Sequence, residues 1–174
     1  MQFSLSKSLE VLERTPQVLF SMLNNLSSQW IEANEGENTW TPKEIVAHLI
    51  ICEKTNWLTR AKIILSDSTD KILSPIDMMG HFDLAKNSSL QDLLKGFSRL
   101  RECSLDELKK LSSDESSLQK TAMHPKVGEV SLQQLIATWV THDLSHITQI
   151  SRVMARQQKE QVGPFEVFLK ILNA

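Results

Sequence analysis

Cysteine, glycine, proline and aromatic residues are all scarce in this chain of 174 residues. Two cysteines are too few for the disulfide framework of a small secreted domain, so we expect Cys52 and Cys103 to be free, partly buried thiols. β-Branched and aromatic residues do not alternate over useful lengths, which argues against a fold built from strands. Because the chain has only five glycines and five prolines, few positions interrupt helical segments.

Long apolar segments and an excess of positive charge are also missing. No apolar run reaches the roughly 18–20 residues that cross a bilayer, so we expect no membrane association. The net charge is −2 and no basic run occurs, so a nucleic-acid partner is not expected either. The N-terminal segment carries acidic groups and lacks the basic start and cleavage site of a signal peptide, which predicts a cytoplasmic protein.

The residues that are present predict one all-α domain spanning residues 1–174. Charged residues make up 23% and hydrophobic residues 41% of the chain, which is ordinary for a globular protein with a single core. Apolar residues recur with helical spacing in four long segments. We therefore predict a four-helix bundle with one long crossover connection and a short C-terminal helix. The predicted helices cover residues 6–27, 41–65, 89–111 and 131–154, with the crossover at 66–89 and the short helix at 163–172.

Capping residues mark the beginnings of three of these helices. Thr41 and Glu44 have the spacing of a capping box. Ser89 and Ser131 stand at the same position relative to the apolar segments that follow them. These residues predict sharp helix starts at 41, 89 and 131.

Other segments are predicted from breaks in the helical pattern. Thr15-Pro16 interrupts the first helix, so either Pro16 begins a second segment or the helix kinks there. The segment HPKVGEVS, residues 124–131, is predicted to be a loop. In the short C-terminal helix, the residues expected to face inward are Phe165, Phe168, Leu169 and Leu172.

The segment THDLSHITQI places His142 and His146 four residues apart on the apolar face of the predicted fourth helix. Residues with this spacing lie one above the other on a helix. Burying two imidazoles without partners costs free energy, so their nitrogens need partners. Hydrogen bonds to neighbouring helices are one solution and a shared metal ion is the other. The spacing of this pair leaves both open.

A third histidine favours the metal. His48 lies beside the apolar stripe of the predicted second helix, and helices in a bundle pack about 8–10 Å apart. A facing helix can therefore bring His48 to His142 and His146. Three imidazoles with one open position are typical of catalytic zinc, although nickel, copper and iron also accept imidazole. The sequence thus predicts a site for a divalent transition metal such as zinc, nickel or iron.

Several neighbouring residues have two interpretations each. Asp143 either orients a metal ligand or makes a packing contact or hydrogen bond between helices. Cys52, four residues after His48, either lies in the core or supplies a ligand. His124 either overhangs the site or is solvated, and His81 is expected to be structural or exposed. The residues expected to line the pocket or the core are Asn56, Trp40, Trp57 and Trp139.

Four motifs carry a resemblance to a known family: WTPKEIVAHLI, CEKTNWLTRAKIIL, HPKVGEVSLQQLIATWVTHDLSHITQISRVMARQ and VGPFEVFLKIL. From about residue 10 to residue 172, the chain resembles the DinB-like (YfiT-like) superfamily of four-helix-bundle proteins. The resemblance implies a metal held by a histidine triad from the second and fourth helices. That triad falls on His48, His142 and His146.

The resemblance also implies a function. Members of the family include transferases that use bacillithiol, mycothiol or glutathione, and isomerases that depend on such thiols. We therefore expect a metal-dependent enzyme of the thiol-transferase type, which joins a small electrophilic substrate to a low-molecular-weight thiol. The alternatives are a metal-dependent hydrolase and a non-catalytic binding module stabilised by the metal. The resemblance and the apolar C-terminal helix together predict a homodimer.

Overall fold

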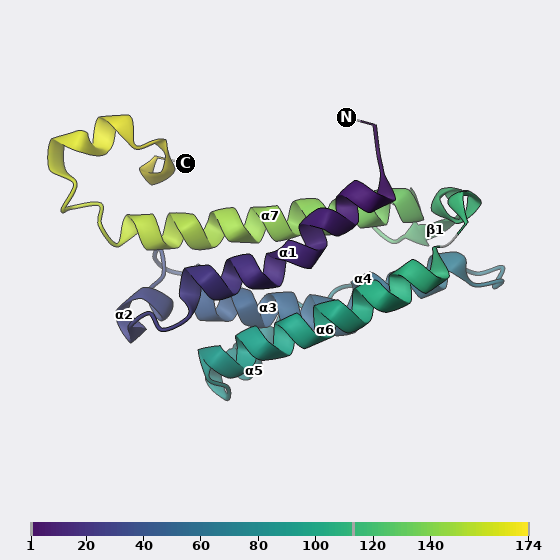
Figure 1. The fold of residues 1–174 in the computed structure, drawn as a ribbon, viewed down its shortest axis with the longest axis horizontal. Coiled ribbons are helices and arrows are strands. Elements are labelled where there is room, and N and C mark those ends of the chain that lie inside the picture. Colours follow the sequence, from purple (N-terminus) through teal and green to yellow (C-terminus); the bar gives the residue numbers. More distant parts are fainter. Residues whose placement is uncertain (1, 113, 174) are drawn as a thin grey trace.

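The computed structural model describes residues 2–112 and 114–173 of the chain. Long helices run side by side along the molecule, with α3 and α4 following one another in the same direction (Figure 1). The helix α1 packs against α6 and α7, and α3 packs against α6. The predicted all-α four-helix bundle is confirmed. The long elements are α1 (Leu5–Leu23), α3 (Pro42–Thr55), α4 (Trp57–Leu65), α6 (Leu90–Leu111) and α7 (Leu132–Arg156).

Side-chain caps begin three of these helices where the sequence predicts them. Thr41 Oγ1 accepts the Glu44 N–H at 3.2 Å, and Glu44 Oε2 accepts the Thr41 N–H at 2.8 Å. Ser131 and Gln134 form the same reciprocal pair before α7, and Ser89 caps α6. Each cap satisfies N–H groups that have no partner inside the helix.

The helix α1 continues through Pro16 without restarting there. The Thr15 hydroxyl donates to the Val11 carbonyl at 3.2 Å instead of capping a new segment. Proline lacks the N–H that would bond to the carbonyl four residues earlier, which belongs to Leu12. The guanidinium of Arg101 on α6 fills that position, donating from Nη1 to the Leu12 carbonyl at 3.0 Å. A contact between helices thus compensates for the proline.

The prediction of one continuous helix over 41–65 is wrong at Asn56. This residue ends α3 and precedes α4, with φ −111° and ψ −73°. The Asn56 N–H still donates to the Cys52 carbonyl at 3.0 Å, and the Asn56 carbonyl accepts the Arg60 N–H at 2.9 Å, so the helical turn is distorted here rather than unwound. The Asn56 side chain is buried beside the two helices.

The predicted long crossover at 66–89 contains ordered elements of its own. It contains the helix α5 (Gly80–Lys86), which begins where the Asp77 carboxylate accepts the N–H groups of Met79 and Gly80 at 2.9 Å. It also contains a short extended stretch at Ile72, which pairs in parallel with Met123. Hydrogen bonds between this stretch and Met123 hold the crossover against the segment that follows α6.

The segment 124–131 is part of a hairpin rather than the predicted loop. Strands β1 (Thr121–His124) and β2 (Gly128–Ser131) pair antiparallel, with Thr121 opposite Ser131 and His124 opposite Gly128. Gly128 has φ +82°, a conformation that residues with a Cβ rarely adopt, and this allows the tight return. The hairpin therefore forms because Gly128 permits the turn, although the residues on either side do not alternate as they do in a typical strand.

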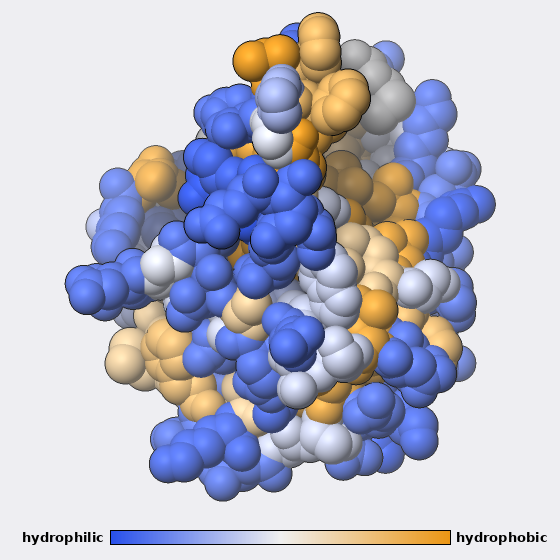
Figure 2. Space-filling view, turned by 90° about the vertical axis from the view of Figure 1, so that its left-hand side faces the viewer, coloured by the Kyte–Doolittle hydropathy of each residue, from blue (hydrophilic) through white to orange (hydrophobic). Residues whose placement is uncertain are grey.

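The predicted short C-terminal helix is present in 3₁₀ form, but the prediction that its apolar side chains face inward is wrong. The segment forms two 3₁₀ turns, η2 (Gly163–Phe168) and η3 (Lys170–Leu172), instead of an α-helix. Phe165 and Phe168 are 70% and 78% exposed, and Leu172 is the member of the expected set that is buried. The segment leaves the end of α7 and gathers apolar side chains at one edge of the molecule (Figures 1 and 2). Helical periodicity predicted that Phe165 and Phe168 would be buried, but within the described residues no helix covers them.

The remaining short elements are α2 (Ser28–Ile31) and the 3₁₀ turn η1 (Glu115–Gln119). Two clusters of buried apolar residues fill the bundle. Cys52 belongs to the first and Leu49 to the second, so both clusters meet along α3. Among the described helices, none is both long and apolar enough to cross a membrane.

Candidate metal centre

Three histidines meet between α3 and α7. The Nε2 atom of His48 lies 3.3 Å from Nε2 of His142, which lies 3.2 Å from Nε2 of His146. One ring nitrogen from each histidine lies within 4.8 Å of those of the other two. The i, i+4 spacing on α7 brings two of the rings together edge to face, with centroids 4.4 Å apart, and packing of α3 against α7 brings the third. The structure therefore unites the three residues that the sequence predicts as ligands.

The surroundings fix the orientation of His146 most firmly. Its Nδ1 lies 2.8 Å from the Gln149 Oε1, so Nδ1 carries the hydrogen and Nε2 presents its lone pair to the other rings. The indole of Trp40 stacks on the same imidazole, with ring centroids 6.1 Å apart and planes at 14°. The Trp57 ring meets His142 edge to face at 5.0 Å. Trp40 thus forms a wall of the site, whereas Trp57 and Trp139 lie buried in the core.

Burial keeps these imidazoles neutral. Burial, together with a smaller effect of the neighbouring imidazoles, lowers the pKa of His48 to about 4 and the pKa of His142 to about 3. Burial lowers the pKa of His146 in the same direction. A divalent cation requires neutral imidazole nitrogens, because protonation would occupy the lone pairs that bind it. The donor set and its protonation state therefore fit a transition-metal ion.

The site is closed on the side of α3 and accessible from α7. His48 is 3% exposed, whereas His142 and His146 are half-buried. A depression of about 180 Å³ is lined by Trp40 and Gln149, which contact His146, but no histidine lines it. Access to the site therefore depends on the partial exposure of His142 and His146 themselves.

Asp143, between the two histidines of α7, points away from them into the bundle. Its carboxylate accepts two bonds from Arg101 on α6, at 2.5 Å to Oδ2 and 3.0 Å to Oδ1. Arg101 also donates from Nε to Glu53 of α3 at 2.9 Å. Burial raises the pKa of Glu53, against the opposing effect of Arg101. Of the alternatives for Asp143, the structure shows the helix-to-helix bond, and within the described residues no imidazole bonds to this carboxylate.

Sequence analysis missed Arg101, which joins three helices at the base of the site. Its side chain is 1% exposed and lies over the rings of Phe97 and Trp139 at 4.8 and 5.1 Å. The signal was available, because Arg101 follows Phe97 by four residues on the apolar stripe of α6. A charged residue in such a stripe requires a buried partner.

The other two histidines have different surroundings. His81 on α5 is fully buried, which rules out the exposed alternative, and its ring lies 4.3 Å from Trp40 and 5.6 Å from His48. Within the described residues, neither of its ring nitrogens has a hydrogen-bond partner. His124 lies in the hairpin, where its Nδ1 accepts the Lys126 N–H at 3.2 Å. His81 therefore adjoins the site, and His124 is held by its own turn.

The two cysteines also differ from the predicted partial burial. Cys103 on α6 is exposed, whereas Cys52 is completely buried. The Cys52 Sγ lies 3.4 Å from His48 Nε2 and 4.0 Å from His142 Nε2. It therefore belongs both to the core and to the surroundings of the three nitrogens.

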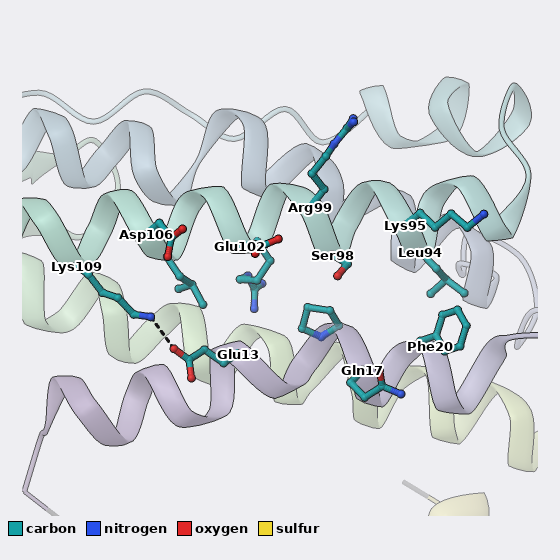
Figure 3. A pocket seen from close by; sticks show the side chains of 13 residues that line it. Glu13, Gln17, Phe20, Leu94, Lys95, Ser98, Arg99, Glu102, Asp106 and Lys109 are labelled. Atoms are coloured by element: carbon teal, nitrogen blue, oxygen red, sulfur yellow. Dashed lines mark hydrogen bonds and ion pairs between the residues drawn. The ribbon is translucent and has the colours of Figure 1, made fainter.

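A larger groove of about 670 Å³ runs between α1 and α6, away from the three histidines (Figure 3). Side chains from both helices face one another across it, and Lys109 pairs with Glu13 at 2.8 Å. Its lining includes Arg101 but no histidine. Size alone would therefore not identify the histidine site, because this groove and another of about 730 Å³ beyond the end of α7 both lack histidines.

Solved structures with the same fold agree with the observed architecture. YfiT from Bacillus subtilis, described as a probable metal-dependent hydrolase with an unusual four-helix bundle topology, matches with a TM-score of 0.74 and 20% identity. The match covers 87% of this chain and 86% of YfiT. TT2238, described as a four-helix bundle protein, matches with a TM-score of 0.60 and 20% identity, over 85% of this chain and 98% of TT2238.

Comparison at the level of sequence supplies the family. No curated protein matches the chain. The model of the DinB superfamily matches residues 11–150, which include all three histidines of the site and most of the bundle. The resemblance found in the sequence motifs is therefore confirmed, and this protein belongs to the DinB superfamily.

Proposed function

We propose that this protein is a metal-dependent enzyme in which His48, His142 and His146 hold one divalent transition-metal ion. The observation that carries the proposal is the convergence of three neutral imidazoles within 4.8 Å of one another, two of them half-buried. Catalytic metal sites commonly combine three protein ligands with an accessible position. Zinc, nickel and iron all fit such a donor set.

A divalent ion bound here would supply Lewis acidity, lowering the pKa of a water or thiol beside it. The protein would hold that ion in place through its own contacts. Gln149 fixes the His146 ring, so that Nε2 faces the other nitrogens. The bond from Arg101 to Asp143 anchors α7 beside the two histidines it carries. Trp40 shields one side of the site from water.

Water is our first candidate for the activated nucleophile, which would make the protein a hydrolase. Three neutral imidazoles would leave the charge of a bound divalent ion uncompensated, which would favour loss of a proton from a water beside it. The description of YfiT as a probable metal-dependent hydrolase supports the same choice.

Transfer of a low-molecular-weight thiol is the second candidate. It is favoured by the half-buried position of His142 and His146, which leaves the site reachable by a sulfur atom on a solvent-borne molecule. The thiol-transferase activity that the sequence resemblance implies stays a prediction. A small-molecule substrate, a cytoplasmic location and a homodimer are parts of the same proposal.

Parallel assays on the metal-loaded protein separate these reactions. Hydrolysis of p-nitrophenyl acetate reports on water, and conjugation of 1-chloro-2,4-dinitrobenzene with glutathione or bacillithiol reports on thiols. We expect turnover in at least one assay, loss in H142A and retention in H124A, the matched hairpin variant. Stoichiometric metal without turnover in either assay would contradict the enzyme and favour the non-catalytic binding module.

A further inference from the structure

The side chain of Cys52 meets the histidine site from the inside of the bundle. Cys52 follows His48 by four residues on α3, which places both on one face of that helix. Its side chain is completely buried. Within the described residues, the polar contacts of its sulfur are the Nε2 atoms of His48 and His142, at 3.4 and 4.0 Å. The thiol thus faces the same point as the imidazoles.

Four of the six distances between these donors are close to the edges of a tetrahedron around one metal ion, and the remaining nitrogen pair, His48 and His146, lies within 4.8 Å. Zinc lies about 2.0–2.1 Å from imidazole nitrogen and about 2.3 Å from thiolate sulfur, so tetrahedral edges are about 3.4 Å between nitrogens and about 3.6 Å between nitrogen and sulfur. The two shortest nitrogen–nitrogen distances here are 3.2 and 3.3 Å. The sulfur–nitrogen distances of 3.4 and 4.0 Å bracket the ideal edge.

We propose that Cys52 is a fourth protein donor to the metal, completing a set of three nitrogens and one sulfur. This inference rests on the proposed function, because it requires a cation at the three histidines. Ligation forms a metal–sulfur bond and breaks the S–H bond, and the proton leaves to solvent. A coordinating metal deprotonates a thiol outright, so the buried side chain changes from a neutral thiol to a thiolate.

The added sulfur donor changes which metals fit and where a substrate binds. Thiolate is a soft ligand that favours zinc, cobalt or copper(I) over magnesium, calcium or manganese. Because Cys52 fills the inner side, an incoming molecule must bind on the outer side, next to His142 and His146, as a fifth ligand. The proposal therefore predicts a metal ion with four protein ligands that accepts a fifth ligand from the outer side of the site.

Cobalt substitution tests the sulfur directly, because a thiolate bound to cobalt(II) gives an intense near-ultraviolet charge-transfer absorption that imidazoles do not give. The full chain is loaded with cobalt(II), and its absorption and cobalt content are measured. We expect the band in the wild-type protein and in C103S, whose exposed thiol is the matched control. We expect C52S and C52A to lose the band while they keep one cobalt per chain.

Two results would overturn the inference while leaving the proposed function intact. One is cobalt bound by the wild-type protein without the band, and the other is a band that persists in C52S. Failure of every protein to bind cobalt would instead refute the proposed metal site itself. If the Cys52 variants do not fold, X-ray absorption of the zinc-loaded wild type decides, because a sulfur neighbour at about 2.3 Å supports ligation and a shell of nitrogen and oxygen alone refutes it.

Discussion

Arg101 on α6 donates hydrogen bonds from two nitrogens to the carboxylate of Asp143 on α7, and both side chains are almost completely buried. Asp143 directly follows His142, so this ion pair fixes the backbone of the helix that presents two of the three histidines. Arg101 reaches α1 and α3 as well, through the Leu12 carbonyl and Glu53. The buried guanidinium of Arg101 therefore links α6 to the three other long helices of the bundle, including the two that carry the histidines.

Removal of one partner of this pair is expected to destabilise the whole domain. D143A leaves the Arg101 guanidinium buried without its main partner, and such a change typically lowers the free energy of unfolding by about 3–5 kcal/mol. The measurement is urea unfolding followed by circular dichroism. The control K109A breaks the exposed pair with Glu13, where about 0–1 kcal/mol is expected. Equal effects in the two variants would contradict the central role of Arg101.

Metal content is expected to depend on all three histidines. Wild-type protein should take up about one divalent ion per chain, and H48A, H142A or H146A should reduce this to background because each removes one of three nitrogens. Plasma mass spectrometry after dialysis measures the stoichiometry. H124A, which alters only the hairpin histidine, should bind as the wild type does. Unchanged metal in the triad variants would show that these residues are not ligands.

Gln149 is expected to tune metal affinity without supplying a ligand. Q149A removes the acceptor that holds Nδ1 of His146, so the ring loses its orientation. Partners of this kind typically contribute about 10–100-fold to affinity. Competition with a coloured chelator measures the dissociation constant, and Q157A, about two helical turns beyond Gln149 at the end of α7, serves as control. Identical affinities in both variants would mean that His146 is held by packing alone.

Acid is expected to destabilise the metal-free protein in the range where histidine protonates. Burial lowers the pKa of His48 to about 4 and that of His142 to about 3, whereas histidine in the unfolded chain has a pKa of about 6.5. Between these values the unfolded state binds more protons, so the free energy of unfolding falls as the pH falls through this window. Urea titrations from about pH 7 down to about pH 4.5 measure it. H142A should show a shallower decline, and an identical slope would contradict the assignment.

Self-association is expected to use the C-terminal segment if the predicted homodimer forms. Phe165, Val167 and Phe168 are 70–78% exposed and lie close together in sequence, so a second copy can cover them. F168E should shift the sedimentation of a dimer towards the monomer. V127E changes an apolar residue of similar exposure in the hairpin turn and should leave the assembly unchanged. A wild-type protein that sediments as a monomer would refute the prediction.

The helical class, the starts of three helices and the choice of three histidines as candidate ligands could be predicted from the sequence. Helical spacing brings His142 over His146 whatever the tertiary structure, and capping boxes such as that of Thr41 are local. The break at Asn56 and the hairpin closed by Gly128 were missed. Both depend on backbone conformations that apolar periodicity does not report.

Which buried groups face the same point depends on how the helices pack against one another. Packing of α3 against α7 brought His48 and Cys52 to His142, and it moved Asp143 away from the imidazoles to Arg101. It also left Phe168 in solvent, although the periodicity predicted burial. The physical reason is that local spacing fixes which side chains share one helix face. Which faces of two helices pack together depends on contacts between segments far apart in the chain. The sequence of either segment alone does not show these contacts.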